Sequence, residues 1–237
     1  MAGCGRKPPG SGAGRAHARD YAARMTLLAA IPDLLTAAGF LLVWMHTEWF
    51  KPQWVATGMT TMLLEFFVVH ASGFYAVVMY GDGPRGRRVL QLAGLAALYL
   101  LMIMAVAWGM HAWWMVGAFF WLTVGKMLAV WNGPARALGF EQSFDRQMMA
   151  MASWALSVAG YLGAMCASVM VDWPAYGVTP DVVRAAGFDP SSSGEWEATP
   201  YKALAGGALY FGAMALLRTL LRLILLRRGS RDTAAVV

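Results

Sequence analysis

The chain has 237 residues, of which 59% are hydrophobic and only 14% charged, and its mean hydropathy is +0.50. About a quarter of the residues in a soluble domain are charged, so this composition excludes an ordinary soluble core and indicates lipid as the solvent. The formal net charge of +6 does not indicate a nucleic-acid partner, because the basic residues lie between apolar runs and not among aromatics on one face.

Six apolar runs predict an all-α, polytopic integral membrane protein with a bundle of six transmembrane helices. The first run is too long for the h-region of a cleaved signal peptide. The apolar stretch 89–131 would form a helix of about 64 Å, roughly twice the hydrocarbon thickness, so it must fold back near Gly109-Met110-His111. The expected spans are about 25–45, 54–80, 89–109, 111–131, 148–171 and 201–226.

These spans predict a single membrane domain at 25–228, between a disordered basic tail at 1–24 and a disordered tail at 229–237. Fifteen Lys and Arg residues fall on one side of the predicted spans and three on the other. Because cytoplasmic loops are enriched in Lys and Arg, we expect a bacterial inner (plasma) membrane with both termini in the cytoplasm. Seven tryptophans then map to the outer interface: Trp44, Trp49, Trp54, Trp108, Trp113, Trp114 and Trp173.

Four ionisable residues fall inside the predicted spans at similar depth, namely Asp33, Glu65, His70 and Lys126. Counted from the outer ends of their helices, they lie about 20, 16, 24 and 22 Å deep. An isolated charge at such a depth costs at least about 3 kcal/mol, so these residues indicate a proton relay, an ion site or a substrate pocket. The alternatives are a polar cluster that fixes helix packing and, for Lys126, snorkelling to the cytoplasmic headgroups.

The second predicted span carries a polar stripe, because Thr57, Thr61, Glu65 and Ser72 recur at helical spacing. We expect the Glu65 carboxyl to be protonated or paired with Lys126. His70 follows Glu65 by five residues, which is about 140° around a regular helix. The two side chains are therefore expected to face different neighbours.

A Met-His-x-x-Trp pattern occurs twice, at Met45-His46 at the end of the first span and at Met110-His111 at the start of the fourth. Imidazole and thioether ligands together would suit Cu(I). We favour a simpler interpretation, in which a polar His marks the water boundary of a tryptophan belt. No cofactor is predicted, with copper as the alternative at these residues. A haem shared by His70 and His111 is excluded by a depth difference of about 24 Å.

The loop 172–200 is long enough to be a lid, and Thr179 followed by Pro180 predicts a short helix within it. Small residues predict close helix packing on the fifth and sixth spans. They are Ser153, Ser157, Gly160, Ala164, Ser168, Ala203, Gly206 and Gly207. The Arg-rich C-terminal end predicts contact with anionic lipid headgroups. Its residues are Arg218, Arg222, Arg227, Arg228 and Arg231.

The sequence favours a protein that is not an enzyme, since it has no P-loop, GxSxG, HExxH or GxGxxG pattern and no soluble domain large enough for a catalytic fold. The first hypothesis is a small-solute or proton-coupled carrier, in which Glu65 titrates and His70 or Lys126 modulates it. The second is a non-catalytic membrane subunit or assembly factor that binds a membrane protein partner. The third is an intramembrane enzyme or copper-handling protein that uses the Met-His pairs.

Overall fold

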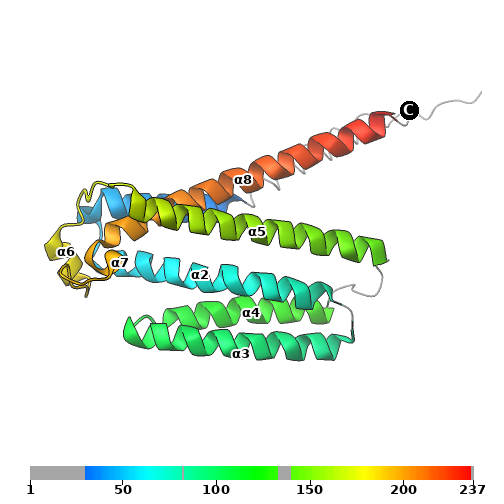
Figure 1. Ribbon diagram of the computed structural model, residues 1–237, viewed down its shortest axis with the longest axis horizontal. Helices are drawn as coiled ribbons and strands as arrows, with labels where there is room; N and C mark the ends of the chain where they lie inside the picture. Colours follow the sequence, from blue (N-terminus) through cyan, green and yellow to red (C-terminus); the bar gives the residue numbers. More distant parts are fainter. Residues whose placement is uncertain (1–29, 82, 133–139, 236–237) are drawn as a thin grey trace, which may run out of the picture. The chain divides into compact units, whose positions relative to one another are not determined.

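The computed structural model describes residues 30–81, 83–132 and 140–235. Every regular element in these ranges is a helix, so the all-α prediction is confirmed (Figure 1). The helices are Ala30–Met45, η1 (Thr47–Trp49), α2 (Gln53–Tyr80), α3 (Arg85–Gly109), α4 (Trp114–Asn132), α5 (Phe140–Met170), α6 (Pro180–Ala185), α7 (Glu195–Ala198) and α8 (Pro200–Ala235).

Helices occupy all six positions at which spans were predicted. Among the described residues, three are long and apolar enough to cross a membrane: α2, α3 and the Ala150–Met170 part of α5. Two further apolar stretches of helix, Ala30–Met45 and Trp114–Leu128, are shorter within the part of the chain that the structure describes. The described residues therefore show an all-helical protein with three candidate membrane helices, not the six spans that we predicted.

The described residues form two compact units, one before Gly39 and after Tyr210, and the other from Gly39 to Tyr210. The first unit holds one end of the helix Ala30–Met45 and most of α8. The second contains α2 to α7, and its interior positions the residues discussed below. The expected single domain at 25–228 stays a prediction.

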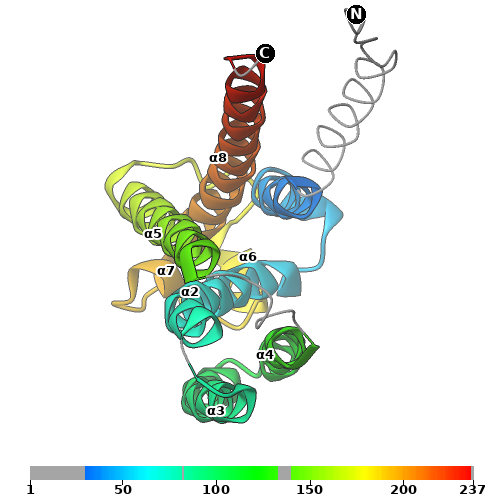
Figure 2. The same ribbon diagram turned by 90° about the vertical axis from the view of Figure 1, so that its right-hand side faces the viewer.

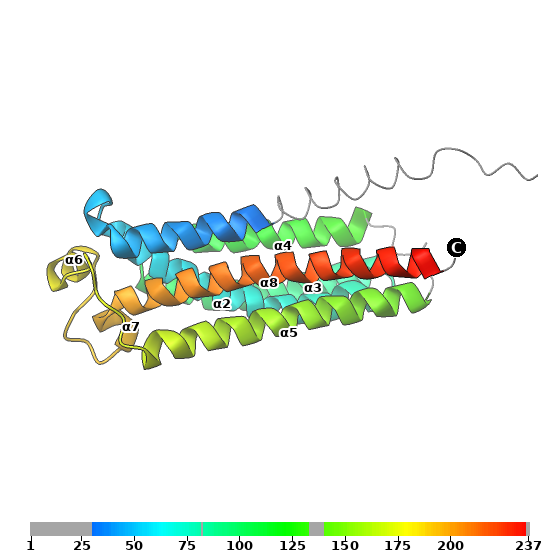
Figure 3. The same ribbon diagram turned by 90° about the horizontal axis from the view of Figure 1, so that it is seen from above.

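In the larger unit, α2 packs against α5 on one side and against the α3–α4 hairpin on the other (Figure 2). The hairpin turns at Gly109-Met110-His111, as the length of the apolar stretch predicted. His111 has a φ of +51°, a left-handed conformation in which histidine is over-represented. The end of α3 and the start of α4 lie at the same end of the larger unit as α6 and α7, whereas the start of α3 follows the end of α2 at the opposite end (Figures 1 and 3).

The core between α2, α3 and α4 is aromatic and aliphatic. It includes Leu64, Phe67, Tyr75, Leu92, Tyr99, Ile103, Met115 and Phe119. Two arginines close the helix ends beside it: Arg88 Nη1 donates to the Met79 carbonyl at 2.8 Å, and Arg85 Nη1 donates to the Trp131 carbonyl at 3.2 Å. Since the last carbonyls of a helix have no partner within it, these arginines satisfy the C-terminal ends of α2 and α4.

Small residues allow the close helix contacts that their spacing predicted. A Cβ on Gly206 of α8 would lie 3.0 Å from Ser168 Cβ of α5. A Cβ on Gly207 would lie 2.5 Å from the Phe40 ring. On α2, Gly73 faces the Trp154 indole, whose Nε1 donates to the Val69 carbonyl at 3.0 Å. These glycines let bulky partners approach the helix backbone.

The loop between α5 and α8 packs against the end of the helix Ala30–Met45. Trp44 Nε1 donates to the Pro174 carbonyl at 2.9 Å, and its ring meets Trp173 and Tyr176 edge-on. Trp44 is therefore buried beneath this loop, and its expected place in an interfacial belt stays a prediction. The predicted helix is confirmed: α6 begins at Pro180, and the Thr179 hydroxyl accepts from the Val182 amide at 3.4 Å.

The predicted tail at 1–24 lies outside the described residues. At the other end α8 continues to Ala235, and the expected disordered tail at 229–237 stays a prediction. The side chains of the C-terminal arginines lie outside the described ones.

Candidate functional site

The Glu65 carboxylate of α2 is hydrogen-bonded to α8. The Tyr210 hydroxyl donates to Glu65 Oε1 at 2.8 Å, and the Tyr210 side chain is only 1% exposed. A buried phenol needs a hydrogen-bond partner, and an ionised carboxylate is a strong acceptor. The contact therefore joins an ionisable side chain of α2 to α8.

A second tyrosine completes this site from α5. The Tyr161 hydroxyl donates to the Met62 carbonyl of α2 at 3.0 Å, and its ring meets that of Tyr210 edge-on at 5.4 Å between centroids. Glu65, Tyr161 and Tyr210, called here the Glu65 site, thus join three helices. Sequence reasoning missed both tyrosines. The sequence does contain a signal for them, because a tyrosine hydroxyl within an apolar helix needs a hydrogen-bond acceptor.

The polar stripe predicted on α2 is present and leads to the Glu65 site. The hydroxyls of Thr57 and Thr61 donate to the carbonyls of Gln53 and Thr57, at 3.0 and 2.7 Å. Such bonds satisfy each hydroxyl proton within the helix and leave the oxygen able to accept another hydrogen bond. A pocket of about 340 Å³ opens at the N-terminal end of this stripe. It is lined by Lys51, Gln53, Trp54 and Thr57.

Lys126 of α4 engages α2 at a different level. Its Nζ donates to Ser72 Oγ at 3.3 Å and lies 4.7 Å from the centroid of the Tyr75 ring. The Tyr75 hydroxyl in turn lies 3.3 Å from Thr123 Oγ1. Ser72 follows Glu65 by seven residues, about 10 Å further along the helix. The expected pairing of Glu65 with Lys126, one of two alternatives for that carboxyl, was therefore wrong, because the ammonium contacts Ser72 and the Tyr75 ring. Snorkelling of Lys126 to the cytoplasmic headgroups stays a prediction.

His70 lies on another face of α2, as its angle from Glu65 predicted. Its exposed imidazole is surrounded by aromatic rings, with centroids 5.5 Å away at Phe66, 6.1 Å at Phe74 and 6.5 Å at Tyr99. The histidine therefore does not belong to the Glu65 site. Asp33 is half-buried on the helix Ala30–Met45, in the smaller unit, and its place in a common polar layer stays a prediction.

The two Met-His pairs lie at helix ends. His46 Nδ1 lies 3.1 Å from Glu48 Oε1, and its ring stacks on Trp49 at 4.2 Å. The backbone amide of Glu48 and the neighbouring His46 hold the pKa of the Glu48 carboxyl below its ordinary value. Met45 and His111 are exposed, and Met110 is half-buried. Across the described ranges, no three His, Cys, Asp or Glu side chains group as metal ligands. The copper alternative stays a prediction.

No protein-family model, curated protein or solved structure matches this chain. The function proposed below therefore depends on the geometry of the chain's own residues.

Proposed function

We propose that this protein is a small-solute carrier coupled to protons, in which the Glu65 carboxyl binds and releases the proton. The observation that supports the proposal most is the hydrogen bond from Tyr210 to Glu65, because it joins an ionisable group to a second helix. Ionisable residues inside membrane helices commonly serve proton and ion pathways.

The proposal places all six of the apolar segments predicted as spans across a bacterial inner membrane, with both termini in the cytoplasm. The distribution of charge supports this topology. Arg85, Arg87 and Arg88 lie at the end of the larger unit where α3 begins, whereas Lys51 lies at the opposite end, just before α2 begins. An excess of arginine on one side of a membrane protein marks the cytoplasmic side.

The path of the solute begins at the pocket lined by Lys51, Gln53, Trp54 and Thr57. From there the hydroxyls of Thr57 and Thr61 lead along one face of α2 to Glu65 at intervals of one helical turn. Their oxygens offer successive acceptors to a polar solute or a hydronium ion. The carboxyl is then the group in this path that changes charge.

Protonation of Glu65 supplies the coupling step. The ionised carboxylate accepts the Tyr210 hydrogen bond, whereas the protonated acid is a weaker acceptor and carries a donor of its own. The α2–α8 contact is therefore expected to loosen when Glu65 is protonated and to tighten when it is ionised. A contact that depends on charge is what a carrier needs to alternate between two states.

Substitution of Glu65 by Gln tests this function, because glutamine keeps the size and the acceptor oxygen but cannot titrate. We expect solute-dependent proton entry into proteoliposomes to be abolished while the protein accumulates and melts normally. Ser153→Ala on α5 is a matched control, since this exposed side chain lies outside the Glu65 site. A Glu65→Gln protein that fails to accumulate would support a packing role in place of transport.

A further inference from the structure

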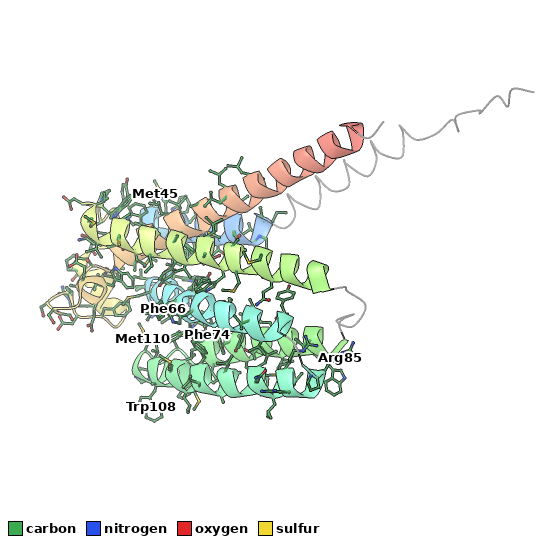
Figure 4. All side chains as sticks on the ribbon, turned by 45° about the vertical axis from the view of Figure 1, so that its right-hand side comes forward. Met45, Phe66, Phe74, Arg85, Trp108 and Met110 are labelled. Carbon is green, nitrogen blue, oxygen red and sulfur yellow. The ribbon has the colours of Figure 1, made fainter. Side chains whose placement is uncertain are left out.

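The face of α2 that carries His70 is chemically unlike an ordinary lipid-facing surface. Phe66, His70 and Phe74 follow one another at four-residue spacing, so they form one stripe, and the two phenylalanines are 40% and 50% exposed (Figure 4). His70 itself is exposed. A polar ring is thus presented at the surface between two apolar rings.

Nothing in the described part of the chain hydrogen-bonds to the His70 imidazole, which makes ring contacts only. A polar group that faces hydrocarbon without a partner costs several kcal/mol. Neutral imidazole has one N–H donor and one nitrogen acceptor. The expected occupant of this face therefore brings a hydrogen-bonding atom to His70.

The side chains around His70 do not favour a packed helix as that occupant. Helices approach one another in membranes through small residues, and the exposed neighbours here are the large rings of Phe66 and Phe74 together with Val77. The small residue on this part of the helix, Gly73, already receives the Trp154 indole of α5. Aromatic rings instead favour a flat ring, which they contact by stacking or edge-on.

We infer that the His70 face binds a lipid-soluble quinone, whose carbonyl oxygen accepts a hydrogen bond from the imidazole while Phe66 and Phe74 hold its ring. The reduced quinol would donate to the unprotonated nitrogen of the same imidazole. Tyr99 of α3 contacts the His70 ring, and Tyr161 of α5 contacts the Phe66 ring. Both tyrosines therefore support side chains of this face. The inference rests on the proposed membrane location of α2 but does not depend on transport through the Glu65 site.

Equilibrium binding of decylubiquinone to the full-length protein in nanodiscs tests the inference, with empty nanodiscs subtracted. We expect one saturable site per chain, weakened about tenfold or more by His70→Leu, because loss of one hydrogen bond of about 1.4 kcal/mol changes affinity by that factor. His70→Gln should retain most of the affinity, since its amide also donates. His111→Leu is the matched control, because it removes another exposed histidine outside this face.

Unchanged affinity in His70→Leu would overturn the inference. So would a wild-type dimer that His70→Leu converts to monomers, because a second copy of the chain would then occupy the face. If His70→Leu does not fold, the Phe66→Leu and Phe74→Leu variants decide: unaltered binding in both overturns the inference. Loss of quinone binding with intact transport, or the reverse, separates this site from the Glu65 site.

Discussion

The Tyr210 hydroxyl donates a 2.8 Å hydrogen bond to the Glu65 carboxylate across 145 positions of the chain. α8 approaches α2 closely in the same region, where Leu204 packs against Gly58. The hydrogen bond of the candidate site therefore lies where small residues let the helices approach one another closely.

Removal of the Tyr210–Glu65 hydrogen bond alone should lower the stability of the protein and weaken the coupling of transport to protons. Tyr210→Phe removes a hydrogen bond to a carboxylate, and such a bond contributes about 1.5–3 kcal/mol, so we expect the free energy of unfolding to fall by that amount. Tyr75→Phe is the control, because that hydroxyl bonds to Thr123 outside the Glu65 site, and its loss should cost about 1 kcal/mol and leave proton coupling intact. Thermal unfolding in detergent measures the stability of each variant, and proton entry into proteoliposomes measures its proton coupling. Equal effects of the two variants on coupling would contradict the role of Tyr210.

The contact between Lys126 and Ser72 predicts which of two variants is the less stable. Lys126→Met removes the charge and leaves nothing unsatisfied, because the Ser72 hydroxyl still donates to the Val68 carbonyl. Ser72→Ala instead leaves the half-buried ammonium without its acceptor, which should cost about 1–3 kcal/mol. We expect Ser72→Ala to lower the melting temperature more than Lys126→Met does. The reverse order would mean that the ammonium is bound elsewhere.

The close contact of Gly73 with Trp154 predicts a steric effect. A Cβ at position 73 would lie 2.5 Å from the indole Cε2, so Gly73→Ala must displace α5 at a cost of about 1–3 kcal/mol. Gly94→Ala on α3 is the matched control, because its Cβ would meet nothing within 4 Å. Denaturant unfolding should separate the two variants, with Gly94→Ala no less stable than the wild type. Equal stability of Gly73→Ala and the wild type would exclude the Trp154 contact.

The loop before α8 contains a carboxylate whose titration can be followed. The Ser191 hydroxyl and amide donate to Asp189 Oδ1 at 2.7 and 2.9 Å, and these bonds hold the pKa of Asp189 below its ordinary value of 3.8. Because the folded pKa is lowered, the stabilisation is complete above 3.8 and is lost as the pH falls through the folded value. The amide NMR shift of Ser191 should titrate with a midpoint below 3.8, and Asp189→Asn should abolish the titration. A midpoint at or above 3.8 would contradict these hydrogen bonds.

Parts of the fold were predictable because long apolar stretches and turn residues follow simple rules of length and spacing. The turn at Gly109-Met110-His111 followed from the excess length of one apolar stretch, and the start of α6 followed from Thr179 and Pro180. The burial of Trp44 was not predictable, since it depends on a loop more than a hundred residues away. A tryptophan at a helix end looks interfacial until its covering segment is known.

Only those features of the candidate site that concern a single helix were predictable from the sequence. Spacing placed Glu65 on a polar stripe and His70 on another face, because both statements concern one helix. The pairing of Glu65 with Lys126 was wrong because depth was estimated without the angle between helices. Lys126 is turned to Ser72, and the partner of Glu65 is a tyrosine that carries no charge to reveal it.

Infrared titration of the reconstituted protein tests the central claim most directly, because it needs no known solute. We expect a protonated-carboxyl band that appears as the pH falls, is missing in Glu65→Gln and is shifted in Tyr210→Phe. An unchanged carboxyl band in Glu65→Gln would contradict the assignment of Glu65 as the titrating group.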